Sequence, residues 1–147
     1  MLTVGDKLPG LTVPVQQGVA ALPAGETLNL GKSDGKWKVL FYWPKDFTFI
    51  CPTEIVGYYQ LKGDFADRNA VLIGASTDTS HVHFAWRKTD EQLASADFPW
   101  IADNSKKLAE ALEKYFEWCT DRSGAIGYEP SRIAAHRLAC KQYFVSP

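Results

Sequence analysis

The chain stretch that decides the fold reads Phe41-Tyr42-Trp43-Pro44-Lys45-Asp46-Phe47-Thr48-Phe49-Ile50-Cys51-Pro52-Thr53-Glu54. It begins in the apolar run Lys38–Trp43, which lies between Gly35 and Pro44 as a buried central strand would. A helix is expected to follow, with Cys51 at its N-cap, Pro52 at its first position and Glu54 as a capping-box carboxylate. The stretch therefore predicts a strand–loop–helix unit with one cysteine where the helix begins.

Cys51 is the first candidate for a reactive group. A sulfur at a helix start faces unpaired backbone N–H groups and the positive end of the helix dipole. Both favour the thiolate, which is the nucleophilic form of cysteine. The alternative is a buried cysteine that acts only as a small hydrophobe. Position 54 holds Glu, so there is no C-x-x-C pair of the kind used in thioredoxin-type dithiol exchange.

The rest of the chain alternates strand-like and helix-like patterns. We expect a short strand at 11–15, a helix from 52 to about 68, a buried strand at 71–76 and a helix from 80 to about 89. Ser80 is expected to cap the helix at 80, with Val82, Ala85 and Trp86 on its inner face. This alternation predicts a βαβ unit and an α/β layered domain.

A further helix is expected after Asp103, which would cap it. Its inward residues are expected to be Leu108, Ala111, Leu112 and Tyr115. With 147 residues, of which 46% are hydrophobic, the chain is long enough for one domain with a core, and we expect a single domain over 1–147.

Bulk properties narrow the function classes. The net charge of −1 gives no electrostatic footprint for nucleic acid or for an anionic membrane. No apolar run approaches the roughly 18–20 residues of a membrane span, and no basic segment followed by an apolar one opens the chain. Three widely spaced cysteines argue against a secreted disulfide framework. We therefore expect a soluble, cytoplasmic protein.

The residues around Cys51 also resemble a known family. The spacing Pro44-x-x-x-Thr48-x-x-Cys51 is similar to the peroxiredoxin signature, and residues 46–55 resemble the alkyl hydroperoxide reductase C and thiol-specific antioxidant (AhpC/TSA) branch. The resemblance covers about residues 3–112. It includes the segments 71–78, 83–87, 98–103 and 108–112.

The resemblance implies a thioredoxin-like α/β fold, with a central mixed sheet flanked by helices. It also implies a thiol-dependent peroxidase for hydrogen peroxide and organic hydroperoxides. Cys51 would attack the peroxide and become a sulfenic acid, without a metal, haem or flavin cofactor. By resemblance, the Thr48 hydroxyl would hydrogen-bond the peroxide and the thiolate, and Pro44 would shield the sulfur from water. Glu54 and Arg87 are expected in a supporting ion-pair network.

The resemblance also implies partners. A thiol reductant, either a thioredoxin-like protein or another thiol, would have to restore the oxidised Cys51. Exposed aromatic side chains at Phe47 or Phe49 would indicate a homodimer or a higher homo-oligomer. We expect neither nucleic acid nor membrane as a partner.

Beyond Leu112 the chain departs from the family pattern. We find no strand of the family's T-F-I-I-D-P type, and none of Arg122, Arg132 and Arg137 matches the arginine that precedes it. Cys119 and Cys140 are the internal candidates for a resolving thiol, although packing roles are favoured for both and an external thiol is at least an equal alternative. We therefore expect an incomplete or atypical C-terminal part, and a truncated or frame-altered product is one hypothesis for it.

The sequence also allows two rival functions. The first is a catalytically inactive, truncated peroxiredoxin remnant that acts as a binding or chaperone-like domain. The second is a Cys–His hydrolase, which would need His81, His83 or His136 within reach of the sulfur. His81 and His83 form an H-x-H pair, but surface or packing roles are favoured over metal binding because no further ligand lies at metal-binding spacing.

Overall fold

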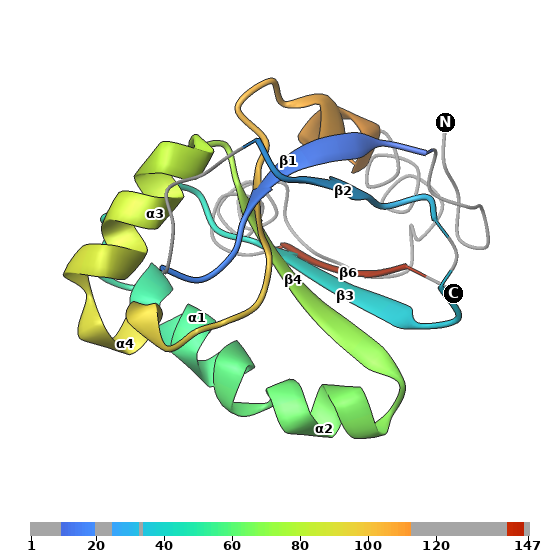
Figure 1. The fold of residues 1–147 in the computed structure, drawn as a ribbon, viewed down its shortest axis with the longest axis horizontal. Coiled ribbons are helices and arrows are strands. Elements are labelled where there is room, and N and C mark those ends of the chain that lie inside the picture. The colour runs from blue at the N-terminus through green and yellow to red at the C-terminus, as the bar shows by residue number, and fades with distance from the viewer. Residues whose placement is uncertain (1–9, 20–24, 33, 113–140, 146–147) are drawn as a thin grey trace, which may run out of the picture.

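The computed structural model describes residues 10–19, 25–32, 34–112 and 141–145. Within this part of the chain, the strands form one sheet in the order β2-β1-β5-β4-β3-β6 (Figure 1). The elements are β1 (Thr12–Gln16), β2 (Thr27–Asn29), β3 (Trp37–Tyr42), α1 (Cys51–Gln60), α2 (Lys62–Asp67), β4 (Ala70–Ser76), α3 (Ser80–Thr89), α4 (Glu91–Ala94), β5 (Trp100–Ala102) and β6 (Lys141–Val145). A further helical segment occupies residues 107–112.

The centre of the sheet is parallel and its flanks are antiparallel. β4 pairs in parallel with β3 on one side and with β5 on the other, so Gly74 lies between Phe41 and Trp100. β1 pairs antiparallel with β5 and β2, and β6 pairs antiparallel with β3. The connections between the parallel strands run through α1 and α2 and then through α3 and α4, as parallel pairing requires.

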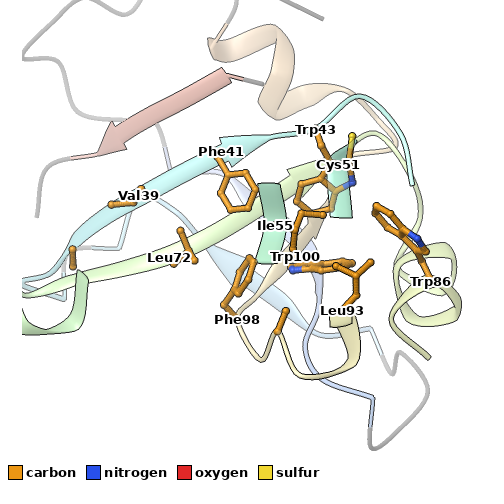
Figure 2. Close-up of a cluster of buried hydrophobic side chains, with 12 residues drawn as sticks. Val39, Phe41, Trp43, Cys51, Ile55, Leu72, Trp86, Leu93, Phe98 and Trp100 are labelled. Carbon is orange, nitrogen blue, oxygen red and sulfur yellow. The ribbon is translucent and has the colours of Figure 1, made fainter. Parts of the chain in front are cut away.

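The two faces of the sheet bury two separate apolar clusters, because successive side chains of a strand point to opposite faces. Val39, Phe41 and Trp43 contribute to one cluster, which lies under α1–α4 (Figures 1 and 2). Leu40 contributes to the other cluster, together with Leu108 from the helical segment at 107–112. The mixed sheet with helices on both faces confirms the predicted fold class.

The predicted helix boundaries need two corrections. The helix expected from 52 to 68 is two helices, because the chain departs from helical geometry at Leu61 (φ −87°, ψ 2°). Thr79, rather than Ser80, is the N-cap of α3, where its side chain accepts a hydrogen bond from the Val82 N–H.

The inner face of α3 also differs from the prediction. The buried residues are His83, Trp86 and Arg87, while Ala85 is exposed and Val82 is only half-buried. Spacings of three and four residues place positions 83, 86 and 87 on one helix face. The helix is therefore turned so that two polar side chains face the core.

Asp103 caps the helical segment at 107–112 as predicted, although residues 104–106 separate it from the first helical residue. Its carboxylate accepts hydrogen bonds from the N–H groups of Leu108 and Ala109 at 3.1 and 2.8 Å, and from the Tyr42 hydroxyl at 2.9 Å. Leu108 and Leu112 are buried, as expected. Tyr115 lies outside the described residues.

One element was missed by the sequence analysis. β6 (Lys141–Val145) pairs with β3 from Lys38↔Val145 to Tyr42↔Lys141, although no strand was expected beyond Leu112. Cys119, Cys140, His136, Arg122, Arg132 and Arg137 lie outside the described residues. No helix in the described ranges is long and apolar enough to cross a bilayer.

Candidate active site around Cys51

Cys51 lies just beyond the carboxyl end of β3, as the first residue of α1. Ligands of open α/β sheets bind at this edge, where the strands end and the helices begin. The N-cap is Ile50, so the cysteine is one position further into the helix than predicted. Ile50 makes no side-chain cap hydrogen bond to α1.

The side chain of Cys51 is 5% exposed and belongs to the apolar cluster under α1–α4. Figure 2 shows it beside Trp43, with Trp86 nearby from α3. The ring centroids of Trp43 and Trp86 lie 6.5 Å apart, and Trp100 approaches the Trp43 ring edge-on at 5.0 Å. An indole-lined site of this kind holds little water around the sulfur.

The predicted partners Thr48 and Pro44 lie on the loop between β3 and α1. Thr48 is half-buried, and its hydroxyl donates a hydrogen bond to the Lys45 carbonyl at 3.1 Å. This bond uses the hydroxyl proton and leaves lone pairs on the oxygen. Pro44 begins the loop and is exposed.

Asp46 fixes this loop from within. Its carboxylate is buried and accepts hydrogen bonds from Trp43 Nε1 at 2.7 Å and from the Ser76 hydroxyl at 3.4 Å, both through Oδ1. Oδ2 lies 2.6 Å from His83 Nδ1. The Asp46 backbone N–H donates to Asp78 Oδ2 at 2.8 Å.

His83 has both ring nitrogens engaged. Nε2 lies 3.1 Å from the Ile101 carbonyl oxygen, which can only accept, so Nε2 carries a proton. Nδ1 is occupied by Asp46. The imidazole therefore has no nitrogen available for Cys51, which argues against the Cys–His hydrolase for this histidine. Its place is in the core, whereas His81 is exposed.

Phe47 turns the loop outward. Its φ of 57° lies in the left-handed region, which residues with a side chain rarely adopt. The Phe47 ring rests 5.9 Å from Trp86 yet remains 58% exposed, and Phe49 and Ile50 beside it are also exposed. The loop thus presents three large apolar side chains to solvent next to the cysteine.

Arg87 lies on α3, where it contacts Phe98 and Trp100. Its guanidinium is buried, with Nη2 donating to the Phe98 carbonyl at 2.6 Å and the group stacked 3.8 Å from the Trp100 ring centre. Burial lowers the pKa of Arg87 to about 9, against the opposing charges of Asp46 and Asp97. Glu54, its expected partner, lies half-buried in the first turn of α1.

Sequence reasoning missed Asp46 and His83 as parts of the site. Both lie within stretches that carry the family resemblance, yet 37 positions separate them. No spacing rule joins residues so far apart, so only the fold could reveal the pair. Among the described residues, no group of three His, Cys, Asp or Glu side chains could hold a metal ion.

The AhpC/TSA family model matches residues 4–144. The chain belongs to the AhpC/TSA family. The match extends beyond residue 112, where the resemblance seen in the sequence alone ends.

Individual relatives agree with this family. The chain is 40% identical over 119 residues to alkyl hydroperoxide reductase C of Mycolicibacterium smegmatis, covering 76% of this chain and 61% of that protein. Among solved structures, Mycobacterium tuberculosis AhpC superposes with a TM-score of 0.64 at 36% identity, covering 72% of this chain and 64% of that one. The structure of reduced 2-Cys peroxiredoxin of Plasmodium vivax superposes with a TM-score of 0.66 at 27% identity, covering 74% of this chain and 57% of that one. The chain thus spans less than two thirds of the length of these relatives.

Proposed function

We propose that this AhpC/TSA protein is a thiol-dependent peroxidase that reduces hydrogen peroxide and organic hydroperoxides through Cys51. The observation that carries the proposal is the position of Cys51 in the first turn of α1, at the carboxyl edge of the sheet. A sulfur at this position faces the N–H groups and the positive dipole end of the helix start, which is where reactive cysteines are found. The names of the relatives support the same chemistry.

In the proposed reaction, Cys51 Sγ forms a bond to one peroxide oxygen while the O–O bond breaks. The sulfur is oxidised to a sulfenic acid, and the other oxygen leaves with the bonding electrons and takes a proton to become water or an alcohol. We assign Thr48 to hold the peroxide through its hydroxyl, and Pro44 to limit access of water to the sulfur. A thiol then condenses with the sulfenic acid, releases water and leaves a disulfide.

The reductant proposed is an external thiol or a thioredoxin-like protein, with Cys119 and Cys140 as the internal alternatives. A second copy of the chain is the proposed partner for the exposed loop side chains Phe47, Phe49 and Ile50. We place the reaction in the cytoplasm, where low-molecular-weight thiols keep such cysteines reduced.

The decisive test follows peroxide consumption with dithiothreitol as the reductant. Wild-type protein is expected to consume peroxide, and to acquire a dimedone adduct on Cys51 that intact-protein mass spectrometry detects. Cys51→Ser is expected to lose both signals. Equal consumption by the two proteins, or no adduct on the wild type, would contradict the proposal.

An inactive remnant is the second candidate, and the buried setting of Cys51 within the apolar cluster favours it. Under that alternative, Cys51 packs the core and peroxide leaves it unmodified. The dimedone experiment separates the two, because only the peroxidase forms a sulfenic acid within seconds of adding stoichiometric peroxide.

A further inference from the structure

His83 is a costly side chain to bury unless its nitrogens are bonded. It is fully buried on α3, among Trp43 at 5.7 Å and Trp100 at 5.6 Å between ring centroids. A polar ring in such surroundings is destabilising when its hydrogen bonds are missing, and an apolar residue would pack there without that cost. Its two hydrogen bonds therefore indicate what the residue does.

Those bonds join the sheet to the loop that precedes Cys51. Nε2 is held by the carbonyl of Ile101, which lies buried in β5, and Nδ1 reaches Oδ2 of Asp46 in the loop. The second contact is made to a carboxylate, and hydrogen bonds that involve a charged group are stronger than neutral ones. One end of the imidazole is thus fixed to a rigid strand, and the other end holds the loop.

Three side chains form hydrogen bonds with the carboxylate of Asp46. Trp43 holds it from the end of β3, Ser76 from the end of β4, and His83 from α3. Only His83 bonds Oδ2 among the hydrogen bonds of the described residues. Removing that donor leaves a buried carboxylate oxygen without a partner, which favours rotation of the side chain toward water.

The loop needs this support because its own conformation is strained. Directly after Asp46, the backbone of Phe47 adopts a left-handed φ of 57°, a conformation that costs about 1–2 kcal/mol for a residue with a side chain. Thr48 follows, and Cys51 begins α1. A shift of Asp46 would therefore move both residues to which the proposed chemistry is assigned.

We propose that His83 is a positioning residue, which acts through Asp46 to hold Thr48 and Cys51 in the geometry for peroxide attack. This inference rests on the proposed peroxidase function. His83 touches neither the sulfur nor the peroxide in this scheme. Its effect on the reaction is indirect, since small misplacements of reacting groups slow a reaction strongly.

The two ring nitrogens allow a matched test. In His83→Asn the amide nitrogen takes the place of Nδ1 and keeps the bond to Asp46. In His83→Gln the amide nitrogen takes the place of Nε2 and keeps the bond to Ile101 instead. Each variant loses one hydrogen bond and some ring volume, so a purely structural role predicts similar effects for both.

The first measurement is the second-order rate constant for sulfenic acid formation with hydrogen peroxide. We expect His83→Asn to stay within about threefold of wild type, and His83→Gln to fall by about tenfold or more, as loss of one charged hydrogen bond implies. Thermal unfolding of both variants provides the comparison of stability. Equal rate constants for the two variants, or rates that follow stability alone, would overturn the proposal.

The second measurement is hydrogen exchange of the amides in the loop 45–50. Faster exchange is expected in His83→Gln than in His83→Asn, and equal exchange would overturn the positioning role. This readout does not depend on peroxidase activity. A wild type that fails to react with peroxide therefore refutes the proposed function, while the exchange comparison still decides whether His83 positions the loop.

If His83→Gln does not fold, Asp46 allows the same comparison from the other side of the bond. Asp46→Asn keeps an acceptor for Trp43 and presents an amide to Nδ1, whereas Asp46→Ala removes both contacts. We expect Asp46→Asn to retain slow loop exchange and Asp46→Ala to lose it. Identical exchange in these two variants would contradict the proposal.

Discussion

Gly74 is predicted to be the most sterically constrained of the glycines that the structure describes. It lies in β4 between Phe41 and Trp100 in the register of the sheet. A Cβ at this position would meet Trp43 ring atoms at 2.6 and 3.0 Å and a Phe98 ring carbon at 3.1 Å. The missing side chain is therefore what allows the Trp43 indole to lie across the strand.

Gly74→Ala is expected to lower the free energy of unfolding by about 1–3 kcal/mol, the usual cost of forcing an extra methyl group into a packed core. Neither ring is the loose end of a flexible side chain. Trp43 is confined by Trp86 and Trp100 and by its hydrogen bond to Asp46, so it cannot move aside without breaking other contacts.

Urea denaturation followed by far-UV circular dichroism measures this change, with the midpoint expected to fall at an unchanged m-value. Gly57→Ala is the matched control. Gly57 lies inside α1, and nothing comes within 4 Å of the Cβ that alanine would add. This control is expected to raise stability by about 0.5–1 kcal/mol, because alanine favours a helix over glycine. A Gly74→Ala protein as stable as wild type would refute the steric argument.

Two further substitutions test the buried polar groups. Arg87→Met is expected to raise the free energy of unfolding at pH 7 by about 1 kcal/mol or more, since a buried charge is replaced by a side chain of similar size; urea titrations at pH 7 and 10 check it. Burial lowers the pKa of Arg87 from its ordinary value in water to about 9 in the fold, so above about pH 9 the unfolded chain holds more protons. As pH rises, Arg87 loses its charge in the folded wild type, and the free-energy cost of burying that charge disappears. The stability advantage of Arg87→Met should therefore shrink. An Arg87→Met protein that is less stable than wild type at pH 7 would contradict this reasoning. Asp103→Ala is expected to cost about 2 kcal/mol or more, because the Leu108 and Ala109 N–H groups and the Tyr42 hydroxyl lose their acceptor; thermal unfolding measures it, and Asp103→Asn, which keeps one carboxamide oxygen, should recover part of the loss.

Local features of the sequence predicted the frame of the site. Three features predicted a cysteine at the start of the helix that follows a buried strand. They are the apolar run before Pro44, the proline after Cys51 and the family spacing. The capping oxygen of Asp103 was found in the same way. Errors of one residue occurred at both helix starts, since Ile50 and Thr79 hold the N-cap positions next to the residues expected there. Neighbouring residues with similar capping chemistry, such as Thr79 and Ser80, cannot be ranked without the backbone angles.

Features that depend on distant contacts could not be predicted. Leu61 interrupts a helical pattern in which no proline marks a break, and α1 and α2 pack separately against the layer of β4. β6 was missed because its pairing with β3 joins residues about a hundred positions apart, as in Leu40↔Tyr143. Tertiary packing decides both cases, and it overrides local propensity.

The face of α3 shows why polar residues mislead such predictions. Hydrophobicity assigned Val82, Ala85 and Trp86 to the core, whereas the fold buries His83, Trp86 and Arg87. Trp86 alone belongs to both the predicted and the observed buried face of α3. The polar side chains therefore determine how the helix is rotated about its axis. His83 and Arg87 are buried because the ends of the sheet and the loop before Cys51 supply acceptors for them, in the Ile101 and Phe98 carbonyls and in Asp46. A helix turned to bury Ala85 would leave Asp46 Oδ2 without the imidazole, and the loop that precedes Cys51 would lose its link through His83 to Ile101 in β5.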